Sequence, residues 1–270
     1  MIENSIKTLW SKGKPVLNGW LSIPSGFSAE IVASQGYDSV TIDMQHGMIE
    51  FGDCLTMLQA MAASRTTPLV RVPWLEPGIV MKVLDAGAYG VICPMVNTRE
   101  QAERLVSYLR YPPDGNRSFG PTRALFSAGS DYASAANSQV ICLAMIETAE
   151  AMENLDEIVA TPGLDGVYIG PADLTLGVTN GRLPPGFDRQ EDEMIETIKR
   201  ILSAAHGAGI RAVLHCGSPD YAARALGWGF DMVTLLNDAR MLSNAAQQSV
   251  SKTRELLGNA NAQGGGDTGY

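Results

Sequence analysis

The sequence lacks the features that mark several classes of protein. Its four cysteines lie far apart without a CxxC pair, which argues against a disulfide framework or a zinc site. No apolar run approaches the ~20 residues of a membrane span. The net charge is −9 and basic residues form no run, so we expect neither nucleic acid nor an anionic membrane as a partner. The start of the chain has no signal-peptide pattern, which predicts a cytoplasmic protein.

Nucleotide-binding fingerprints are missing as well. Neither GxGxxG nor GxxxxGK[ST] occurs, so a doubly wound, nucleotide-binding sheet is not supported. The chain instead alternates between short apolar runs and helical patterns. Such apolar runs, rich in β-branched residues, are typical of buried parallel strands. The runs begin near Val16, Ser39, Pro68, Tyr89, Val140, Gly166, Ile210 and Phe230.

A helical pattern follows each predicted strand. The predicted helices cover residues 28–35, 51–63, 77–86, 98–110, 148–160, 191–206, 219–228 and 238–257. Eight strand–helix pairs in about 250 residues predict an α/β protein with a (β/α)₈ TIM barrel. We therefore expect one barrel domain over residues 1–257. The Gly-rich residues 258–270 are predicted to form a disordered tail.

Two long loops interrupt this pattern. The first, 111–138, leads into the strand before Glu147 and is expected to overhang a functional site, because long loops in compact domains usually have a function. The second, 177–188, follows Asp173 and is expected to shape the mouth of the same site.

Two carboxylates stand at the ends of consecutive predicted strands. Glu147 closes the run 140–146, and Asp173 follows the run 166–172. In a barrel of parallel strands the carboxyl ends meet at one rim, where the chemistry takes place. Each residue alone could be a turn or cap residue, but together they predict a site for a hard divalent cation, which prefers oxygen ligands.

Other polar residues are predicted at the same rim. His46 follows the second strand, and Asp43 three residues earlier could orient it for proton transfer, although a surface or capping role is the alternative. Arg71 ends the third strand and needs an anionic partner. That partner could be Asp43 or a substrate carboxylate, and we favour the substrate. His215 ends the seventh strand and its role stays open.

These side chains suggest chemistry on a 2-oxo acid. Such an acid can chelate a cation through its keto and carboxylate oxygens, and the cation then stabilises an enolate as a Lewis acid. Arg71 would add a donor to the oxyanion, and His46 would move a proton. Because no lysine stands at a predicted strand end, a Schiff-base aldolase has no evident nucleophile.

At these residues the chain resembles the HpcH/HpaI aldolase family, the metal-dependent class II pyruvate aldolases. The similarity extends from about Gly19 to the last helix, and its most specific part is the combination of two motifs on consecutive strands. The matching segments are Asp43-Met44-Gln45-His46-Gly47, Leu69-Val70-Arg71-Val72-Pro73-Trp74, Leu84-Asp85-Ala86-Gly87-Ala88, Tyr111-Pro112-Pro113, Ile146-Glu147-Thr148 and Ile169-Gly170-Pro171-Ala172-Asp173-Leu174.

The resemblance implies a barrel of the phosphoenolpyruvate/pyruvate type. Its eighth helix would be swapped between subunits of a hexamer, a trimer of dimers. Glu147 and Asp173 would hold Mg, Mn or Co, and His46 with Asp43 would form an acid/base dyad. Arg71 would contact the pyruvate enolate.

The resemblance also implies a substrate-binding segment and contributions from outside the barrel rim. Backbone amides near Pro171, Ala172 and Asp173 would bind the pyruvate carboxylate, and Gly170 belongs to the same substrate-binding segment. Asp85 would reach the site of a neighbouring subunit, and Arg123 is a candidate for binding an anionic group. Met145 departs from the family, which often has Gln at that position, so the resemblance does not extend to one exact substrate.

The leading hypothesis is a lyase that reversibly cleaves 4-hydroxy-2-oxo acids to pyruvate, or hydroxypyruvate, and an aldehyde. A citrate-lyase-β-like or malyl-CoA-lyase-like activity, or oxaloacetate decarboxylation, would use similar chemistry. A coenzyme A enzyme should present a basic patch, which this acidic chain does not plainly offer. The alternative outside the enzymes is a metabolite-binding barrel without turnover. The presence of both His46 and Arg71 argues against it.

Overall fold

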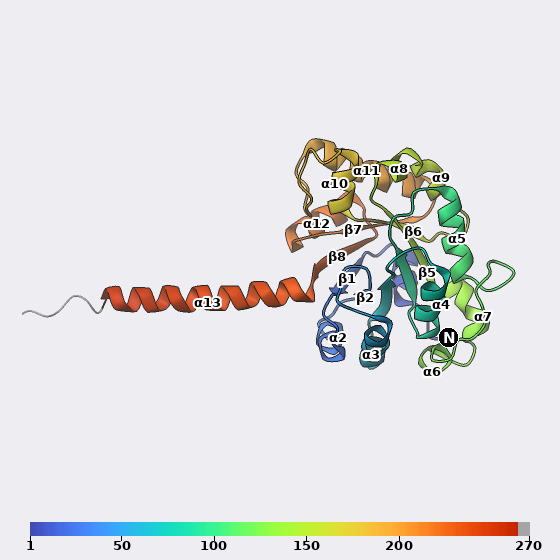
Figure 1. The fold of residues 1–270 in the computed structure, drawn as a ribbon, viewed down its shortest axis with the longest axis horizontal. Helices are drawn as coiled ribbons and strands as arrows, with labels where there is room; N and C mark the ends of the chain where they lie inside the picture. The colour runs from blue at the N-terminus through green and yellow to red at the C-terminus, as the bar shows by residue number, and fades with distance from the viewer. Residues whose placement is uncertain (264–270) are drawn as a thin grey trace, which may run out of the picture.

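The computed structural model describes residues 1–263 (Figure 1). Within these residues, eight parallel strands pair in chain order and close into a barrel, which confirms the predicted TIM barrel. The strands are β1 (Val16–Leu21), β2 (Ser39–Asp43), β3 (Thr67–Arg71), β4 (Gly90–Cys93), β5 (Ile141–Ile146), β6 (Gly166–Ile169), β7 (Arg211–His215) and β8 (Met232–Asn237).

Helices surround the barrel. They are α1 (Ser5–Ser11), α2 (Gly26–Ala33), α3 (Phe51–Met61), α4 (Pro77–Asp85), α5 (Arg99–Leu109), α6 (Ala124–Ala128), α7 (Tyr132–Gln139), α8 (Ala149–Glu153), α9 (Leu155–Val159), α10 (Pro171–Val178), α11 (Asp192–Gly207), α12 (Pro219–Trp228) and α13 (Asp238–Gln263). Local sequence explains several starts: Thr98 and Gln101 form a capping box on α5, and prolines open α4 and α12. None of the described helices is long and apolar enough to cross a membrane.

The structure differs from the prediction at several helices. Residues 148–160 form two short helices, α8 and α9, that meet at Asn154. The helices α1, α6, α7 and α10 were not predicted. Helix α13 continues to Gln263, beyond the predicted end at Leu257, because the Gly-rich run starts only at Gly264. The first part of the predicted disordered tail is therefore helical, and residues 264–270 lie outside the described part of the chain.

Two apolar clusters fill the domain. The larger cluster packs the outer face of the barrel against the surrounding helices. The smaller one fills the barrel interior and includes Leu69, Leu143 and Met232, together with Ile6 and Trp10 of α1. The Trp10 indole nitrogen donates to the carbonyl of Asp231 at 3.1 Å. Helix α1 thus closes the amino-terminal end of the barrel, and the carboxyl end is left for the site.

The loop 111–138 does not overhang that end, so this prediction is wrong for the chain's own barrel. Arg117 pairs with Asp85 at 2.7 Å, and Arg123 donates to the carbonyls of Ala86 and Leu58. These partners lie near the last turns of α3 and α4, at the amino-terminal end of the barrel. The loop is therefore held next to the N-terminus, as Figure 1 shows for α6 and α7.

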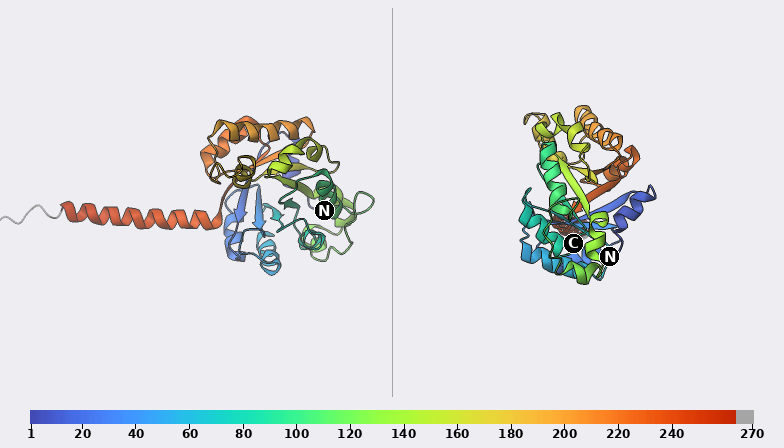
Figure 2. Two further views of the ribbon diagram at one scale, coloured as in Figure 1. Left: turned by 45° about the horizontal axis from the view of Figure 1, so that its top comes forward. Right: turned by 90° about the vertical axis from the view of Figure 1, so that its right-hand side faces the viewer.

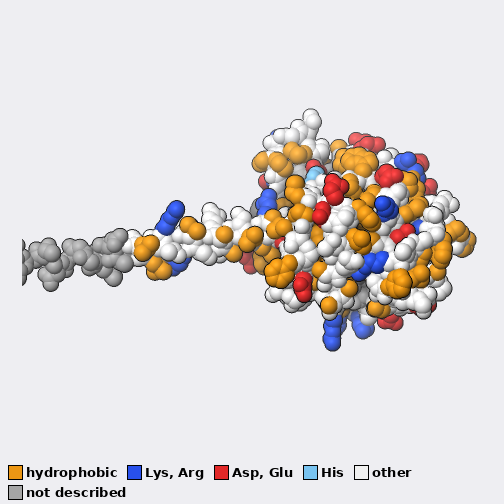
Figure 3. Space-filling view, turned by 60° about the horizontal axis from the view of Figure 1, so that its bottom comes forward, with side chains coloured by type: hydrophobic (Ala, Val, Ile, Leu, Met, Phe, Trp, Pro, Cys, Tyr) orange, Lys and Arg blue, Asp and Glu red, His pale blue; other side chains and the backbone are white. Residues whose placement is uncertain are grey.

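Helix α13 projects away from the barrel. Figures 1 and 2 show it extending from the end of β8 without another helix beside it. Its side chains Leu242, Val250, Leu256 and Leu257 are exposed, by 64%, 50%, 56% and 60%. Figure 3 shows apolar side chains along this helix. A helix with this much exposed apolar surface is expected to pack against a partner.

Candidate active site

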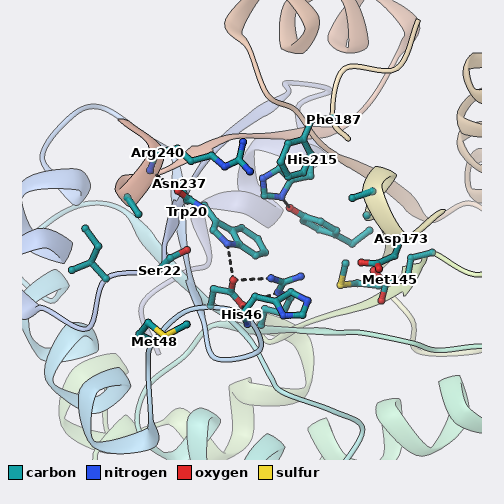
Figure 4. Close-up of a pocket in the computed structure, with 18 of the residues that line it drawn as sticks. Trp20, Ser22, His46, Met48, Met145, Asp173, Phe187, His215, Asn237 and Arg240 are labelled. Carbon is teal, nitrogen blue, oxygen red and sulfur yellow. Dashed lines mark hydrogen bonds and ion pairs between the residues drawn. The ribbon is translucent and has the colours of Figure 1, made fainter. Parts of the chain in front are cut away.

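A cavity of about 580 Å³ opens at the carboxyl end of the barrel. Its walls come from the ends of β1, β2, β3, β5, β6, β7 and β8 and from the segments that follow them (Figure 4). Seven of the site residues predicted from the sequence line it together: Asp43, His46, Arg71, Glu147, Gly170, Ala172 and Asp173.

Asp43 and Arg71 form a buried ion pair on one wall of the cavity. The Nε and Nη2 atoms of Arg71 donate to the two carboxylate oxygens of Asp43, at 2.8 and 2.7 Å. The guanidinium also stacks on Trp20, with Cζ 4.8 Å from the ring centroid. The structural partner of Arg71 is thus Asp43, and the substrate carboxylate that we favoured as its partner is not needed to explain its charge.

Asp43 makes no hydrogen bond to the imidazole of His46 among the described residues. Its carboxylate accepts hydrogen bonds from the backbone amides of Gln45 and His46, at 3.0 and 3.2 Å, and from the Trp20 indole at 3.1 Å. Burial alone would raise the pKa of Asp43. The hydrogen bonds and charge of Arg71, and the hydrogen bonds from the His46 amide and the Trp20 indole, hold this pKa below its ordinary value. Asp43 is therefore a fixed anion that shapes the β2–α3 loop, and its acid/base dyad with the His46 side chain stays a prediction.

Asp173 lies across the cavity from Trp20 (Figure 4), and Glu147 lines the same cavity. Glu147 Oε1 accepts a 2.8 Å hydrogen bond from the amide of Met95, whose φ of 55° is unusual for a side chain of this size. Burial, and then the charge of Asp173, raise the pKa of Glu147 to about 7, against the effects of Met95 and Arg71. Two acidic side chains that disfavour each other's charge are suited to share a cation.

Gly170 leaves room for Glu147. A Cβ atom at this position would lie 2.6 Å from Glu147 Oε2 and 2.9 Å from the terminal carbon of Met145. Gly170 also caps α10, whose first residues are Pro171, Ala172 and Asp173. The amides of a first helical turn have no partner within the helix and attract anions, so this segment can bind a carboxylate next to the acidic pair.

His215 belongs to a hydrogen-bonded network inside the barrel. Its Nδ1 atom lies 2.9 Å from the Tyr168 hydroxyl, which is 2.8 Å from Thr234 Oγ1, and Asn18 donates to the same Thr234 oxygen at 2.9 Å. Phe187 stacks on the imidazole at 4.7 Å. Burial, and then the charges of Arg71 and Arg240, lower the pKa of His215 to about 3. The imidazole is therefore neutral at ordinary pH.

Several residues of the site escaped prediction. Trp20, Tyr168, Phe187, Asn237 and Arg240 all line the cavity. Trp20 stands near the end of the first predicted strand and could have been found by inspecting that end. Phe187 comes from the loop 177–188, which was expected to shape the mouth. Arg240 had no signal, because a basic residue in the first turn of a helix is usually only a surface residue.

Asp85 and Arg123 do not line the cavity of their own barrel. Asp85 ends α4, and burial raises its pKa although the hydrogen bond and charge of Arg117 oppose this. Arg123 lines a second depression at the other end of the barrel, with Gly87 and Ser127. A role for either residue in a site would require a neighbouring subunit.

The sequence of this chain matches a known family. The family model described as HpcH/HpaI aldolase/citrate lyase covers residues 19–245. The chain belongs to the HpcH/HpaI aldolase/citrate lyase family. This confirms the resemblance noted at the motifs around His46, Glu147 and Asp173.

Two relatives are similar over nearly the whole chain. The hydroxypyruvate/pyruvate aldolase of Rhizorhabdus wittichii is 46% identical over 94% of this chain and 100% of its own length. The 2-keto-3-deoxy-L-rhamnonate aldolase of Escherichia coli K12 is 36% identical over 93% of each chain.

Solved structures agree with the fold. An HpcH/HpaI aldolase/citrate lyase family protein from Burkholderia cenocepacia has a TM-score of 0.85 and 32% identity, over 93% of this chain and 99% of its own. The citrate synthase SbnG has a TM-score of 0.83 and 28% identity, over 94% and 98%. The chain is thus similar to proteins with different names, and its activity has to be argued from its own site.

Proposed function

We propose that this protein is a divalent-metal-dependent aldolase that reversibly cleaves 4-hydroxy-2-oxo acids into pyruvate, or hydroxypyruvate, and an aldehyde. The observation that carries the proposal is the meeting, in one cavity, of the acidic pair Glu147 and Asp173 with Arg71 and His46. The names of the two aldolases similar to this chain over nearly its whole length support the same activity.

The acidic pair fits a hard divalent cation such as Mg, Mn or Co. Glu147 Oε1 is held by the Met95 amide, while Oε2 accepts no hydrogen bond from the described residues and faces the space left by Gly170. Within residues 1–258, no group of three or more His, Cys, Asp or Glu side chains is placed so that it could hold a metal ion by itself. Two carboxylates are a usual protein contribution to a Mg²⁺ site, with the remaining positions left to water and substrate. When bound, the cation supplies Lewis-acid polarisation of the 2-oxo group.

The residues around the acidic pair orient the 2-oxo acid. The first-turn amides of α10, at Ala172 and Asp173, donate hydrogen bonds to its carboxylate. Two nitrogens of Arg71 are fixed on Asp43, and the third, Nη1, has no hydrogen-bond partner among the described residues. Nη1 is therefore available to donate to the oxo oxygen as negative charge develops there, and the ion pair keeps it in place.

His46 serves the proton transfer. It lines the cavity, and its imidazole accepts or donates no hydrogen bond within the described residues. Its backbone amide is fixed by Asp43 at 3.2 Å, so the loop position is set while the ring can turn toward a substrate or water. In the cleavage direction the ring accepts the proton of the 4-hydroxyl group as the carbon–carbon bond breaks. That proton then goes to the C3 carbon of the product.

A pyruvate-release screen tests the proposal. The protein is incubated with a panel of 4-hydroxy-2-oxo acids, with Mg²⁺, Mn²⁺ or Co²⁺ and after exhaustive chelation, and pyruvate is measured with lactate dehydrogenase. Hydroxypyruvate release is measured in parallel. We expect release with at least one substrate only when a cation is present. Full activity at zero metal content would contradict the role of Glu147 and Asp173.

We also propose that the protein works as a homo-oligomer, with the hexamer as the expected state. The exposed apolar side chains of α13 support this, because in one protomer they face solvent. Swapping this helix would cover them, and a neighbouring copy could bring Asp85 to the site. Light scattering on the purified protein tests this proposal, and a fully active monomer would contradict it.

A further inference from the structure

One end of the cavity carries a positive charge that the proposed chemistry does not use. Arg240 lies in the first turn of α13 and lines the cavity together with Asn237 and Ser243. Its backbone amide donates to Asn237 Oδ1 at 2.8 Å, which ties the residue to the end of β8. Figure 4 shows Arg240 and Asp173 on opposite sides of the cavity, with Trp20 and His215 between them.

The charge of Arg240 is not neutralised within the described residues. No carboxylate lies within 4.0 Å of its guanidinium there. The neighbouring Asp238 is used elsewhere: its oxygens accept from the amides of Ser22 and Ile23 and from the Ser28 hydroxyl. An arginine that faces a cavity without an acidic partner is available to a ligand.

The guanidinium is held toward the cavity by an aromatic wall. Arg240 Cζ lies 5.7 Å from the ring centroid of Phe187, and Phe187 stacks on His215 at 4.7 Å. His215 in turn meets Trp20 edge-on at 4.9 Å. This wall runs from the catalytic end of the cavity to Arg240, so a short carbon chain could lie along it with its polar end at the arginine.

We propose that Arg240 binds an anionic group, a carboxylate or a phosphate, at the far end of the aldehyde partner. The inference rests on the proposed aldolase function and adds the class of acceptor. Arg240 then orients the substrate by attracting the anionic end of the aldehyde to the side of the cavity opposite Asp173. Arg240 acts as a specificity-determining residue and takes no part in the proton transfer.

The experiment compares matched aldehydes in the condensation with pyruvate. The carboxylate arm uses 4-oxobutanoate against butanal, and the phosphate arm uses glyceraldehyde 3-phosphate against glyceraldehyde. In each arm the ratio of kcat/KM for the anionic and the neutral aldehyde is measured. The variants are Arg240→Gln, which removes the charge, and Arg240→Lys, which keeps it. Arg104→Gln, on the exposed face of α5, is the control.

We expect the wild type to prefer the anionic aldehyde in one arm, and that arm identifies the group. Arg240→Gln should lower the ratio about tenfold or more, since one charge-assisted hydrogen bond is worth about 1.5–3 kcal/mol. The loss should come mainly from KM for the aldehyde. Arg240→Lys should restore part of the ratio, and Arg104→Gln should not change it. Because Arg240 is exposed, its replacement should leave the fold intact.

Two failures can be told apart. If the wild type condenses pyruvate with neutral aldehydes but shows no anionic preference in either arm, or if Arg240→Gln keeps the ratio, the inference is overturned and the aldolase function stands. If the wild type neither condenses pyruvate with any aldehyde nor releases it in the cleavage screen, the proposed function itself is wrong, and the inference falls with it.

Discussion

Asp43 and Arg71 are register partners on β2 and β3, and two hydrogen bonds of 2.8 and 2.7 Å join their side chains. The strand register thus places a carboxylate and a guanidinium side by side at the rim of the barrel. This ion pair explains why a charged Arg71 can stand at a largely buried strand end. It also fixes the direction of Nη1, which has no hydrogen-bond partner among the described residues.

The first prediction concerns the stability that this pair contributes. Asp43→Asn leaves the buried Arg71 without its counter-charge, which should lower the free energy of unfolding by about 3–5 kcal/mol at neutral pH. Because the pKa of Asp43 is lowered by folding, the stabilisation is present above its ordinary value of 3.8 and is lost as the pH falls through the folded-state pKa. Urea unfolding at several pH values measures both effects. Equal stability of variant and wild type at pH 7 would show that the pair is not stabilising.

The second prediction concerns His46. His46→Ala should keep the fold and the metal content but lower turnover by ~10²-fold or more, the usual contribution of a general acid or base. His206→Ala is the matched control, since His206 pairs with Asp231 outside the cavity. Turnover, circular dichroism and metal content are measured for both variants. An unchanged rate at unchanged metal content would make His46 a structural residue.

The third prediction tests the space beside the acidic pair. Gly170→Ala would bring a Cβ atom to within 2.6 Å of Glu147 Oε2, so the carboxylate must move. We expect weaker binding of Mn²⁺, measured by titration calorimetry or electron paramagnetic resonance. Gly207→Ala on α11 is the control, because a Cβ there meets no atom within 4 Å. Equal Mn²⁺ affinity in the two variants would argue against Glu147 as a ligand.

The fourth prediction concerns the neutral His215. Its pKa is about 3 in the folded protein and about 6.5 in the unfolded chain. Between these values the unfolded state binds more protons, so stability falls as the pH falls below about 6.5. One group of this kind contributes about 2 kcal/mol of loss between pH 6.5 and 5. We expect His215→Asn to remove that part of the pH dependence of unfolding. The same slope in variant and wild type would mean that His215 titrates normally.

The sequence was sufficient to predict the barrel and the rim because both depend on short-range patterns. Apolar runs define strands, and parallel strands bring Glu147, Asp173, His46 and Arg71 to one end. The pairing of Arg71 with Asp43 could not be chosen from the sequence, since it depends on the register of β2 against β3.

Other errors arose from long-range contacts. The loop 111–138 was placed over the site because it precedes the strand of Glu147, but Arg117 and Arg123 hold it at the other end through bonds to Asp85, Ala86 and Leu58. Arg240 was missed because its distance to the cavity depends on how β8 ends and α13 begins.

The central claim is that the residues of this cavity remove a proton from the methyl group of pyruvate, and that Arg71 stabilises the negative charge that develops on the oxo oxygen. Exchange of the methyl protons in heavy water, followed by NMR, tests it without any aldehyde. We predict exchange by the wild type with Mg²⁺ or Mn²⁺, none after chelation, and a loss of roughly 2–4 kcal/mol in transition-state stabilisation, about 30- to 10³-fold in rate, for Arg71→Lys. No exchange by the metal-loaded wild type, or exchange at the wild-type rate in Arg71→Lys, would contradict the claim.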